Sequence, residues 1–431
     1  MTQKRTAAPW SVMLAIVLAM IIGPLVGVEG SFWGIRPYAI FEVLGTIFIN
    51  ALTLVVVPLV SSSIISGIAR IGNETSFGRL GLKTLGFYFA TTLIAVIIGV
   101  VFVNVIQPGF YYAHGDVANL IGEGNLSTIK NQATVHGSFD FVEFILQIVP
   151  SNVLEAFSHG EMLGLIFFSM LFGYALSKID SEPAKILLGF WQGIFQAMIK
   201  IAQIVLKFLP IGVFCLVARS FAKTGFSSIE PLMLFSLTVI LGLGLFMFIA
   251  LPLFLRCVAK VSPIRHFKAM MPALVTAFST SSSSASIPIT LECVEKRAGV
   301  SNKIASLVVP LGTSINLSGS ALYECVAALF VAQAYGIDPP IATQFAVILL
   351  ALFASIGVAG VPAGSLVATI IIMKSIGLPA EGIGLFLAVD RFMDMARTTV
   401  NIFSDSTCAV LVAATEGEKN ILQKDHFTDL A

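Results

Sequence analysis

Charged residues are scarce in this chain. Asp, Glu, Lys and Arg make up 11% of its 431 residues, against about 25% in a typical soluble domain. Hydrophobic residues make up 57%, and the mean hydropathy is +0.94. This composition excludes an ordinary soluble domain. It predicts a polytopic membrane protein that is surrounded by a lipid bilayer and has no nucleic-acid partner.

Cysteine and histidine are also scarce. The five cysteines form no CxxC pair, so neither a disulfide framework nor a thiolate metal site is predicted. The five histidines fall in loops or near the ends of the predicted spans, which argues against an intramembrane serine protease, because its nucleophile needs a nearby base. They are His114, His136, His159, His266 and His426. We therefore expect no enzyme activity, no cofactor and no metal beyond an alkali cation.

Long apolar stretches dominate the first half of the chain. Most of them reach the about 20 residues that a helix needs to cross hydrocarbon. They are residues 11–28, 41–69, 84–107, 162–177, 187–218 and 230–257. Lys4 and Arg5 precede the first stretch, which we interpret as a transmembrane helix with a cytoplasmic N-terminus.

The distribution of Lys and Arg indicates the orientation. With the N-terminus in the cytoplasm, sixteen of the 25 basic residues fall inside, five fall outside and four lie within spans, in agreement with the positive-inside rule. This count holds only if the segments around the serine run at 279–284 and around residues 355–365 each enter and leave the membrane on the same side. Both are therefore predicted to be re-entrant hairpins, and the C-terminus is predicted to be cytoplasmic.

The second half contains two similar blocks. Each has a hairpin of small residues around a proline, AFSTSSSSASIPIT at 277–290 and ASIGVAGVPAGSLVATI at 354–370, followed by a long helical pattern with polar groups. Hairpins that enter from opposite faces form an inverted repeat, in which transporters bind substrate near the membrane midplane. A flexible linker is the alternative for the serine run, but apolar residues flank it.

The most informative stretch is DRFMDMARTTVNIFSD, at residues 390–405. Its polar positions are spaced by 4, 3, 4 and 4 residues, so they share one helix face within roughly 80°. They are Asp390, Asp394, Arg397, Asn401 and Asp405. A central Asp or Arg costs about 2.5 to 3.5 kcal/mol in lipid, so this face must lie inside the protein. It is either a self-satisfied ion cluster or a ligand site. The mixture of acidic, basic and amide side chains on this face favours a ligand site for an amino acid with an extra acidic group.

A second helical pattern is interrupted at the segment NLSGS. We expect Gly319 to weaken the helix there and to free backbone carbonyls. With Asn316, Asn401 and Asp405, these carbonyls would form an all-oxygen cage for a hard cation, although a simple kink is the alternative. Glu324 follows in the same pattern and is predicted either to carry a proton or to pair with a cation elsewhere.

Together these motifs resemble those of the glutamate transporter homologues, a family of dicarboxylate/amino acid:cation symporters that includes the excitatory amino acid transporters. The resemblance covers essentially the whole chain and rests on SSSSASIP, NLSGSALYE, GVAGVPAG and DMARTTVNIFSD, in that order. It implies an all-α membrane protein with eight transmembrane helices, two re-entrant helical hairpins and inverted repeats. It also implies an elevator-type homotrimer, in which a transport domain moves against a fixed scaffold.

The resemblance implies the following division of the chain. The segments are 1–83 (scaffold helices 1 and 2), 84–107 (helix 3, transport domain), 108–142 (external loop), 143–222 (scaffold helices 4 and 5), 223–417 (transport domain) and 418–431 (cytoplasmic tail). The segment 223–417 begins with helix 6. The elements that follow are hairpin 1 (about 264–295), helix 7 (about 302–333), hairpin 2 (about 341–374) and helix 8 (about 381–415).

Roles in substrate binding follow from the same resemblance. It implies that Arg397 binds the side-chain carboxylate of the substrate, that Asp394 binds its amino group, and that Asn401 and Thr398 hold its main-chain part. The residues implied to close over the ligand are Ser283, Ser320 and, through its backbone, Val361.

The resemblance implies three cation sites. The ligands of the first site would be Gly312, Asn316, Asn401 and Asp405. The second site would be formed by Ser314 and the backbone of residues 355–358, which begin with Ser355. The third site would be formed by Thr91, Thr92 and Asn316.

The chain departs from the family pattern at several positions. The family usually has the segment NMDGT where this chain has NLSGS, so that Leu317 replaces the Met and Ser318 replaces the Asp. The loss of the Asp removes the anionic ligand of the third cation site. Relatives carry an arginine at the position of Ser281 or of Met395, and this chain has neither. Glu324 matches the proton-carrying position of the animal members. We therefore expect a symporter with a reduced sodium stoichiometry, driven by protons, sodium or both.

The substrate expectation rests on two residues. Arg397 and Asp394 are both present, which favours glutamate and aspartate. The alternatives are cystine or a dicarboxylate as the substrate and, from a different class, an anion channel that does not transport or a structural trimer. The short external loop and the compact chain suggest a protein of a bacterial inner membrane.

Overall fold

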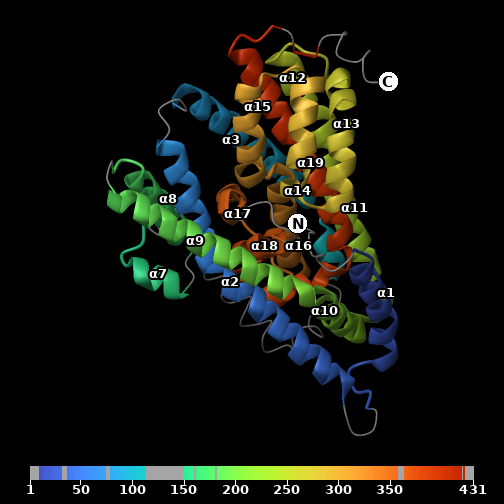
Figure 1. The fold of residues 1–431 in the computed structure, drawn as a ribbon. Helices are drawn as coiled ribbons and strands as arrows, with labels where there is room; N and C mark the ends of the chain where they lie inside the picture. The colour runs from blue at the N-terminus through green and yellow to red at the C-terminus, as the bar shows by residue number, and fades with distance from the viewer. Residues whose placement is uncertain are drawn as a thin grey trace.

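The computed structural model describes residues 9–31, 36–73, 78–112, 149–159, 162–179, 182–357, 364–419 and 421–422, and in these parts every regular element is a helix (Figure 1). The all-helical architecture agrees with the sequence prediction. The predicted external loop beyond Tyr112 lies outside the described residues, as do residues 423–431.

Five stretches are long and apolar enough to cross a membrane. They are Pro37–Ala69, Arg79–Tyr111, Glu182–Lys223, Ile229–Cys257 and Asn302–Ala334. Two of the predicted spans, at 11–28 and 162–177, form shorter apolar helices, Ser11–Val26 and Gly164–Leu176.

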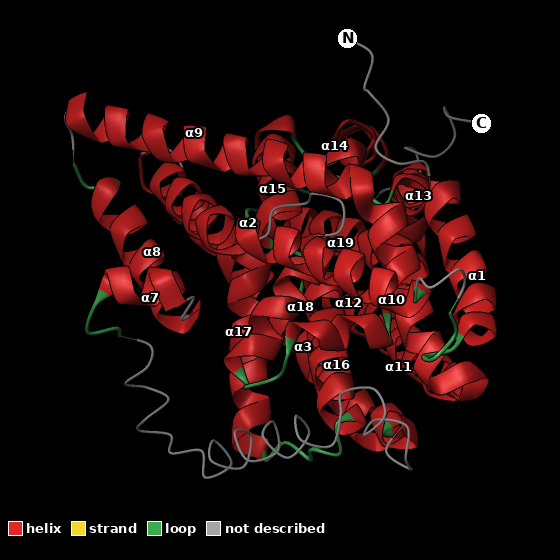
Figure 2. Cartoon of the chain, turned by 90° about the horizontal axis from the view of Figure 1, so that it is seen from below, coloured by secondary structure: helices red, strands yellow, loops and turns green. Residues whose placement is uncertain are grey.

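One set of helices comes from the first half of the chain. It comprises α1 (Pro9–Val26), α2 (Pro37–Asn73), α7 (Val153–His159), α8 (Met162–Leu176), α9 (Glu182–Val205) and α10 (Leu209–Thr224). Helix α1 packs on α10, and α2 packs on α8, α9 and α10. An ion pair of 3.0 Å between Arg219 and Glu42 also joins α10 to α2. Figure 2 shows α9 running along the edge of the molecule, with one side uncovered by this chain.

A second set consists of α3 (Gly78–Ile106) and the helices from the second half of the chain. It includes α11 (Ile229–Leu245), a π-helical turn (Phe246–Ala250), α12 (Leu251–Cys257), α13 (Pro263–Thr280), α14 (Ser283–Glu292), α15 (Asn302–Ile315), α16 (Ser318–Ala334), α17 (Ile341–Gly357), α18 (Gly364–Ser375) and α19 (Leu387–Thr415). Helix α16 lies at its centre, because all 17 of its residues are buried. Its neighbours are α3, α11, α17, α18 and α19. Helix α3 begins at Gly78, six residues before the predicted start at 84, because the apolar pattern alone does not show its polar first turns.

The serine run forms the tip of a helical hairpin. Helix α13 ends at Thr280, Ser281 adopts the left-handed conformation with φ of 49°, and α14 begins at Ser283. The side chain of Ser282 accepts a hydrogen bond from the backbone of Ala285 and so caps α14. The alternative of a flexible linker is therefore wrong.

The two hairpins approach from opposite ends of α3. At the start of α3, Lys83 contacts the end of α19, and the chain that follows α19 contacts Arg265 at the start of α13. At the other end of α3, Asn104 bonds to Gln344 at the start of α17. A helix of 29 residues is about 43 Å long, so the bases of the two hairpins lie on opposite sides of the protein.

The first residues of the predicted cytoplasmic tail are packed against the protein. Glu418 accepts a hydrogen bond from the backbone of Ser301 at 3.1 Å, and the backbone of Leu422 donates to Ala298 at 2.8 Å. Leu422 is buried. The apolar pair Ile421 and Leu422 is buried and covers the base of the first hairpin, so the predicted tail is not solvated at these two residues.

We predict that the substitution Glu416→Gln lowers the unfolding temperature at pH 7 and that this difference shrinks as the pH is lowered. A hydrogen bond from Lys83, supported by the charge of Arg79, lowers the pKa of Glu416 below its ordinary value of 4.5. The stabilisation is therefore present above that value and is lost as the pH falls through the lowered pKa. Thermal unfolding in detergent from about pH 3 to 7 measures the difference. Glu182→Gln, in an exposed pair with Lys185, is the control, and a difference that does not shrink as the pH falls would contradict the prediction.

Candidate functional site

The polar face predicted for residues 390–405 lies on α19 and is buried. Arg397 and Asp405 have no exposed surface, and Asp390 and Asp394 are each 8% exposed. A fully buried arginine in the middle of a 29-residue helix requires acidic partners and hydrogen bonds close by. The structure supplies them from α19 itself and from α16.

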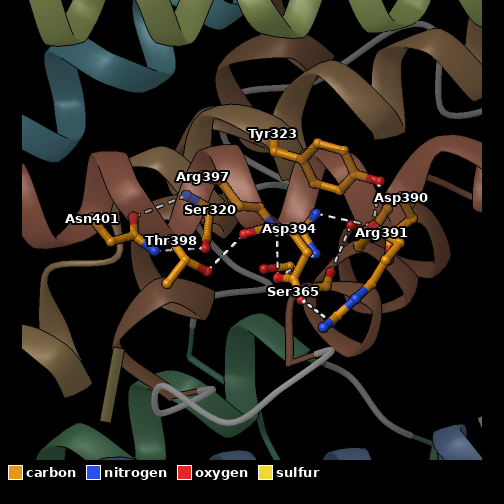
Figure 3. A network of polar contacts seen from close by, with 10 residues as sticks. Ser320, Tyr323, Ser365, Asp390, Arg391, Asp394, Arg397, Thr398 and Asn401 are labelled. Atoms are coloured by element: carbon orange, nitrogen blue, oxygen red, sulfur yellow. Dashed lines mark hydrogen bonds and ion pairs between the residues drawn. The ribbon is translucent and has the colours of Figure 1, made fainter. Parts of the chain in front are cut away.

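Arg397 is held by two aspartates and one aromatic ring (Figure 3). Its Nη1 donates to Asp390 Oδ1 at 3.0 Å, and its Nε donates to Asp394 Oδ1 at 3.2 Å. Its guanidinium lies 4.2 Å from the centroid of the Tyr323 ring, and the Tyr323 hydroxyl donates to Asp390 at 2.8 Å. Nη2 makes an ion pair with Asp394 but no hydrogen bond among the described residues. One donor of this buried cation is thus left for a ligand.

Asp394 lies between two arginines. While Oδ1 accepts from Arg397, Oδ2 accepts from Arg391 Nη1 at 3.2 Å. The backbone carbonyl of Asp394 accepts from the Thr398 hydroxyl at 2.7 Å, within the same helix. In the sequence, Arg391 is only one of the four basic residues that fall within predicted spans. Its contact with Asp394 was not predicted.

Asn401 connects α19 to the start of α16. Its Oδ1 accepts from the backbone amides of Gly319 at 2.8 Å and Ser320 at 3.3 Å, and its Nδ2 donates to Ser320 Oγ at 3.1 Å. The first amides of a helix have no partner within the helix, so Asn401 satisfies two of them.

The role predicted for Gly319 is wrong. The helix is interrupted two residues earlier, at Asn316 and Leu317, and Gly319 lies inside α16. A Cβ atom at Gly319 would lie 2.9 Å from the backbone oxygen of Arg397. The glycine therefore permits the close approach of α16 and α19 and does not itself break the helix.

Three of the four residues predicted for the first cation site are brought together. Asn316 Nδ2 donates to Asp405 Oδ1 at 2.9 Å, and a Cβ atom at Gly312 would lie 2.5 Å from the same oxygen. Asp405 Oδ2 is buried and has no hydrogen-bond partner among the described residues. A buried carboxylate oxygen without a donor fits a cation. Asn401, the fourth residue, is engaged with α16 instead.

The third predicted site is a cluster of uncharged oxygens. Thr91 and Thr92 each donate to Asn316 Oδ1 at 3.2 Å. Ser318 donates to the same oxygen at 2.9 Å and lies 3.0 Å from Thr92 Oγ1 and 3.2 Å from Ser404 Oγ. Because these groups satisfy one another and none carries a charge, the cluster offers a cation much less than Asp405 does.

The second predicted site lies partly outside the described residues. Ser314 is exposed, while the side chain of Ser355 and all of residues 358–363, including Val361, lie outside the described parts. Ser283 is buried at the start of α14. Ser281 is also buried, and its hydroxyl has no partner among the described residues.

Glu324 is buried in α16. It is 1% exposed and forms a hydrogen bond with the side chain of Ser365 on α18. It makes no ion pair with any described residue, and its Oε2 has no hydrogen-bond partner there. Of the two predicted roles, pairing with a cation is therefore not seen in these parts of the chain.

Other polar residues near the site were missed. Tyr323 could have been found, because it follows Ser320 by three positions on the same helix. Ser404 contacts Asn316, and Tyr88 donates to the carbonyl of Val308, through tertiary contacts that no local pattern shows. His266 lies at the start of α13, as expected for a residue near the end of a span. It is fully buried and bonds to Ser406 at 3.1 Å, which the sequence does not indicate.

We predict that Gly319→Ala separates α16 from α19. A methyl group 2.9 Å from the Arg397 carbonyl must displace backbone, at a cost of about 1 to 3 kcal/mol. The unfolding temperature in detergent should fall, and substrate binding should weaken with it. Gly244→Ala on α11, where a Cβ atom meets nothing within 4 Å, is the matched control. An equal effect of the two substitutions would contradict the close-approach role.

Comparisons with known proteins show what the whole chain is similar to. The model of the sodium:dicarboxylate symporter family matches residues 12–415. The proton/sodium-glutamate symport protein of Geobacillus stearothermophilus is 34% identical over 421 residues, which cover 97% of this chain and 96% of the relative. The proton/glutamate-aspartate symporter of Escherichia coli K12 is 34% identical over 411 residues (94% and 92%), and human excitatory amino acid transporter 3 is 33% identical over 439 (92% and 83%). These matches confirm the resemblance found in the sequence.

Proposed function

We propose that this chain, which belongs to the sodium:dicarboxylate symporter family, takes up glutamate and aspartate across a membrane together with cations. The observation that carries this proposal is the fully buried Arg397 beside Asp394 on α19. An acidic amino acid offers a carboxylate to Arg397 and an ammonium group to Asp394. Relatives named as glutamate or glutamate-aspartate symporters support the same substrate class.

Binding would exchange one set of ion pairs for another. The side-chain carboxylate of the substrate would take the Nη2 of Arg397, which has no hydrogen bond among the described residues, and would replace Asp394 there. The ammonium group would then bind Asp394. Arg397 and Asp394 thus each keep a partner of opposite charge during this exchange, which matters because an unpaired buried charge costs several kcal/mol. Thr398 and Asn401 would hold the main-chain part, and the remaining contacts would come from Ser283, Ser320 and Val361.

We propose Asp405, Gly312 and Asn316 as the ligands of a coupling cation. The unpartnered Asp405 oxygen supports this site. Ser318 supplies no charge to the neighbouring hydroxyl cluster, so we expect fewer sodium ions per substrate than three complete sites would bind. Glu324 is the candidate proton carrier, since it is buried without an ion pair in the described parts of the chain.

The proposed architecture has eight transmembrane helices and two hairpins, with both termini in the cytoplasm of a bacterium and the protein in its inner membrane. The helices around α3 and α16 would form the transport domain and move as a unit against α1, α2 and α7–α10. Packing within each set, and the opposite directions of the two hairpins, support this elevator model.

A homotrimer is supported by α9. This helix carries a polar stripe on its exposed side, within roughly 80° of the helix circumference. The stripe consists of Lys185, Gln192, Gln196, Lys200 and Gln203, and Lys207 continues it in the turn Leu206–Phe208 that follows α9. Because lysine and glutamine are costly against lipid, we propose that water or neighbouring copies of the chain cover this face.

A cystine or dicarboxylate symporter remains the second candidate, and an anion channel the third.

The first test is uptake by the purified protein in liposomes. Labelled aspartate should accumulate under an imposed proton gradient, and a sodium gradient should add to the uptake, because Glu324 and Asp405 offer one site for each ion. Competition with glutamate, cystine and succinate identifies the substrate, and exchange stimulated by internal substrate excludes a channel. Uptake that requires a sodium gradient and ignores a pH gradient would contradict the proton-coupled model.

The second test is the substitution Arg397→Ala. It removes the carboxylate partner and leaves Asp390 and Asp394 without a cation between them, so aspartate uptake should fall by about 100-fold or more. Thr399→Ala on the same helix, whose hydroxyl donates to the backbone carbonyl of Met395, is the control. Unchanged uptake by the Arg397 variant would show that the residue assignment is wrong.

A further inference from the structure

Arg391 and Arg397 approach the two oxygens of Asp394 from different positions. Asp394 Oδ2 is 3.2 Å from Arg391 Nη1, and Oδ1 is 3.2 Å from Arg397 Nε. On the helix, Arg391 and Arg397 lie about 60° to either side of Asp394. Arg397 has no exposed side-chain surface, whereas 15% of the Arg391 side chain is exposed. Asp394 therefore has one fully buried cationic neighbour and one at the edge of the site (Figure 3).

The charge of this cluster depends on Arg391. Asp390 and Asp394 are balanced by Arg391 and Arg397, and no other described residue forms an ion pair with these four. Without Arg391 the cluster would carry a net charge of −1 before an anionic substrate enters. Arg391 Nε is also buried and has no hydrogen bond among the described residues, so this side chain is more than a surface charge beside the site.

The two arginines would behave differently when substrate binds. Arg397 would leave Asp394 for the substrate carboxylate, as the proposed function requires. Asp394 then needs another cation. An amino acid supplies its ammonium group, whereas a dicarboxylate such as succinate supplies none. With Arg391 in place, Asp394 keeps a partner in both cases, so a substrate without an ammonium group does not leave a buried carboxylate unpaired.

We propose that Arg391 is a specificity-determining residue: it satisfies Asp394 when the bound substrate has no ammonium group, and so admits four-carbon dicarboxylates to a site built for acidic amino acids. In amino acid binding, Arg391 at Oδ2 shares the negative charge of Asp394 with the substrate ammonium group, which would bind the oxygen Oδ1 that Arg397 leaves, so Arg391 weakens the binding of the ammonium group. Both effects of Arg391 strengthen succinate binding relative to aspartate binding. Removal of Arg391 should weaken succinate binding relative to aspartate binding. This inference rests on the proposed function of the site.

The test is equilibrium binding of labelled aspartate to the purified full-length protein in detergent, with unlabelled succinate as competitor. The ratio of the succinate Kd to the aspartate Kd is compared between the wild-type protein and Arg391→Gln. We expect the ratio to rise about tenfold, the size of one charge-assisted hydrogen bond in a partly buried site. An unchanged or lower ratio would overturn the proposal.

Further variants separate this role from a structural one. Arg391→Met keeps the aliphatic stem and should raise the ratio like the Gln variant, so it serves if the first variant does not fold. Arg391→Lys keeps the charge and should stay close to the wild-type ratio. Arg256→Gln, an exposed arginine at the end of α12, should leave the ratio unchanged.

The effect of Arg391 on the ratio of the two Kd values must depend on Asp394. In an Asp394→Asn background, Arg391→Gln should no longer change the ratio, because there is no carboxylate for the arginine to satisfy. A tenfold change that persists in this background would overturn the proposal. If the wild-type protein binds neither ligand, the proposed function fails together with this inference. If it binds aspartate and Arg391→Gln leaves the ratio unchanged, only this inference fails.

Discussion

A fully buried arginine is the constraint on which the centre of this protein depends. Arg397 cannot face lipid and cannot lose its proton, so its surroundings must supply negative charge and hydrogen bonds. Asp390 and Asp394 supply the charge from α19, and Tyr323 covers the guanidinium from α16. Helix α16, which covers Arg397, is itself buried along all of its residues.

Two adjacent polar clusters illustrate opposite solutions to burial. The hydroxyls of Thr92, Ser318 and Ser404 bond to one another or to Asn316 and need no ligand. Asp405, which shares Asn316 with them, keeps one oxygen without a donor among the described residues. A self-satisfied cluster fixes the position of the helices, whereas an unsatisfied carboxylate provides the attraction for a cation. The division follows from one residue, since an aspartate in place of Ser318 would make both clusters anionic.

Much of this arrangement could be predicted from the sequence, because it follows from periodicity. The spacing of Asp390, Asp394 and Arg397 places them on one face of α19 whatever surrounds the helix, and small residues around a proline indicated the hairpins. The contacts between helices could not be predicted. The bond between Glu324 and Ser365, for example, depends on how α16 and α18 are rotated against each other. Gly319 was misread for the same reason: its local effect on a helix is weak, and the carbonyl that it accommodates belongs to a helix about eighty residues away.

The interruption at Asn316 and Leu317 has an electrostatic consequence. It divides one long segment into two aligned helices, so that the last carbonyls of α15 and the first amides of α16 lie next to each other in the middle of the protein. The end of a helix carries a partial negative charge and the start a partial positive charge. The negative pole of α15 therefore lies beside Asp405, and the positive pole of α16 lies beside Arg397 and Asn401. A single break in the chain thus creates a field that attracts a cation on one side and a carboxylate on the other, and the bound ions would attract each other across it.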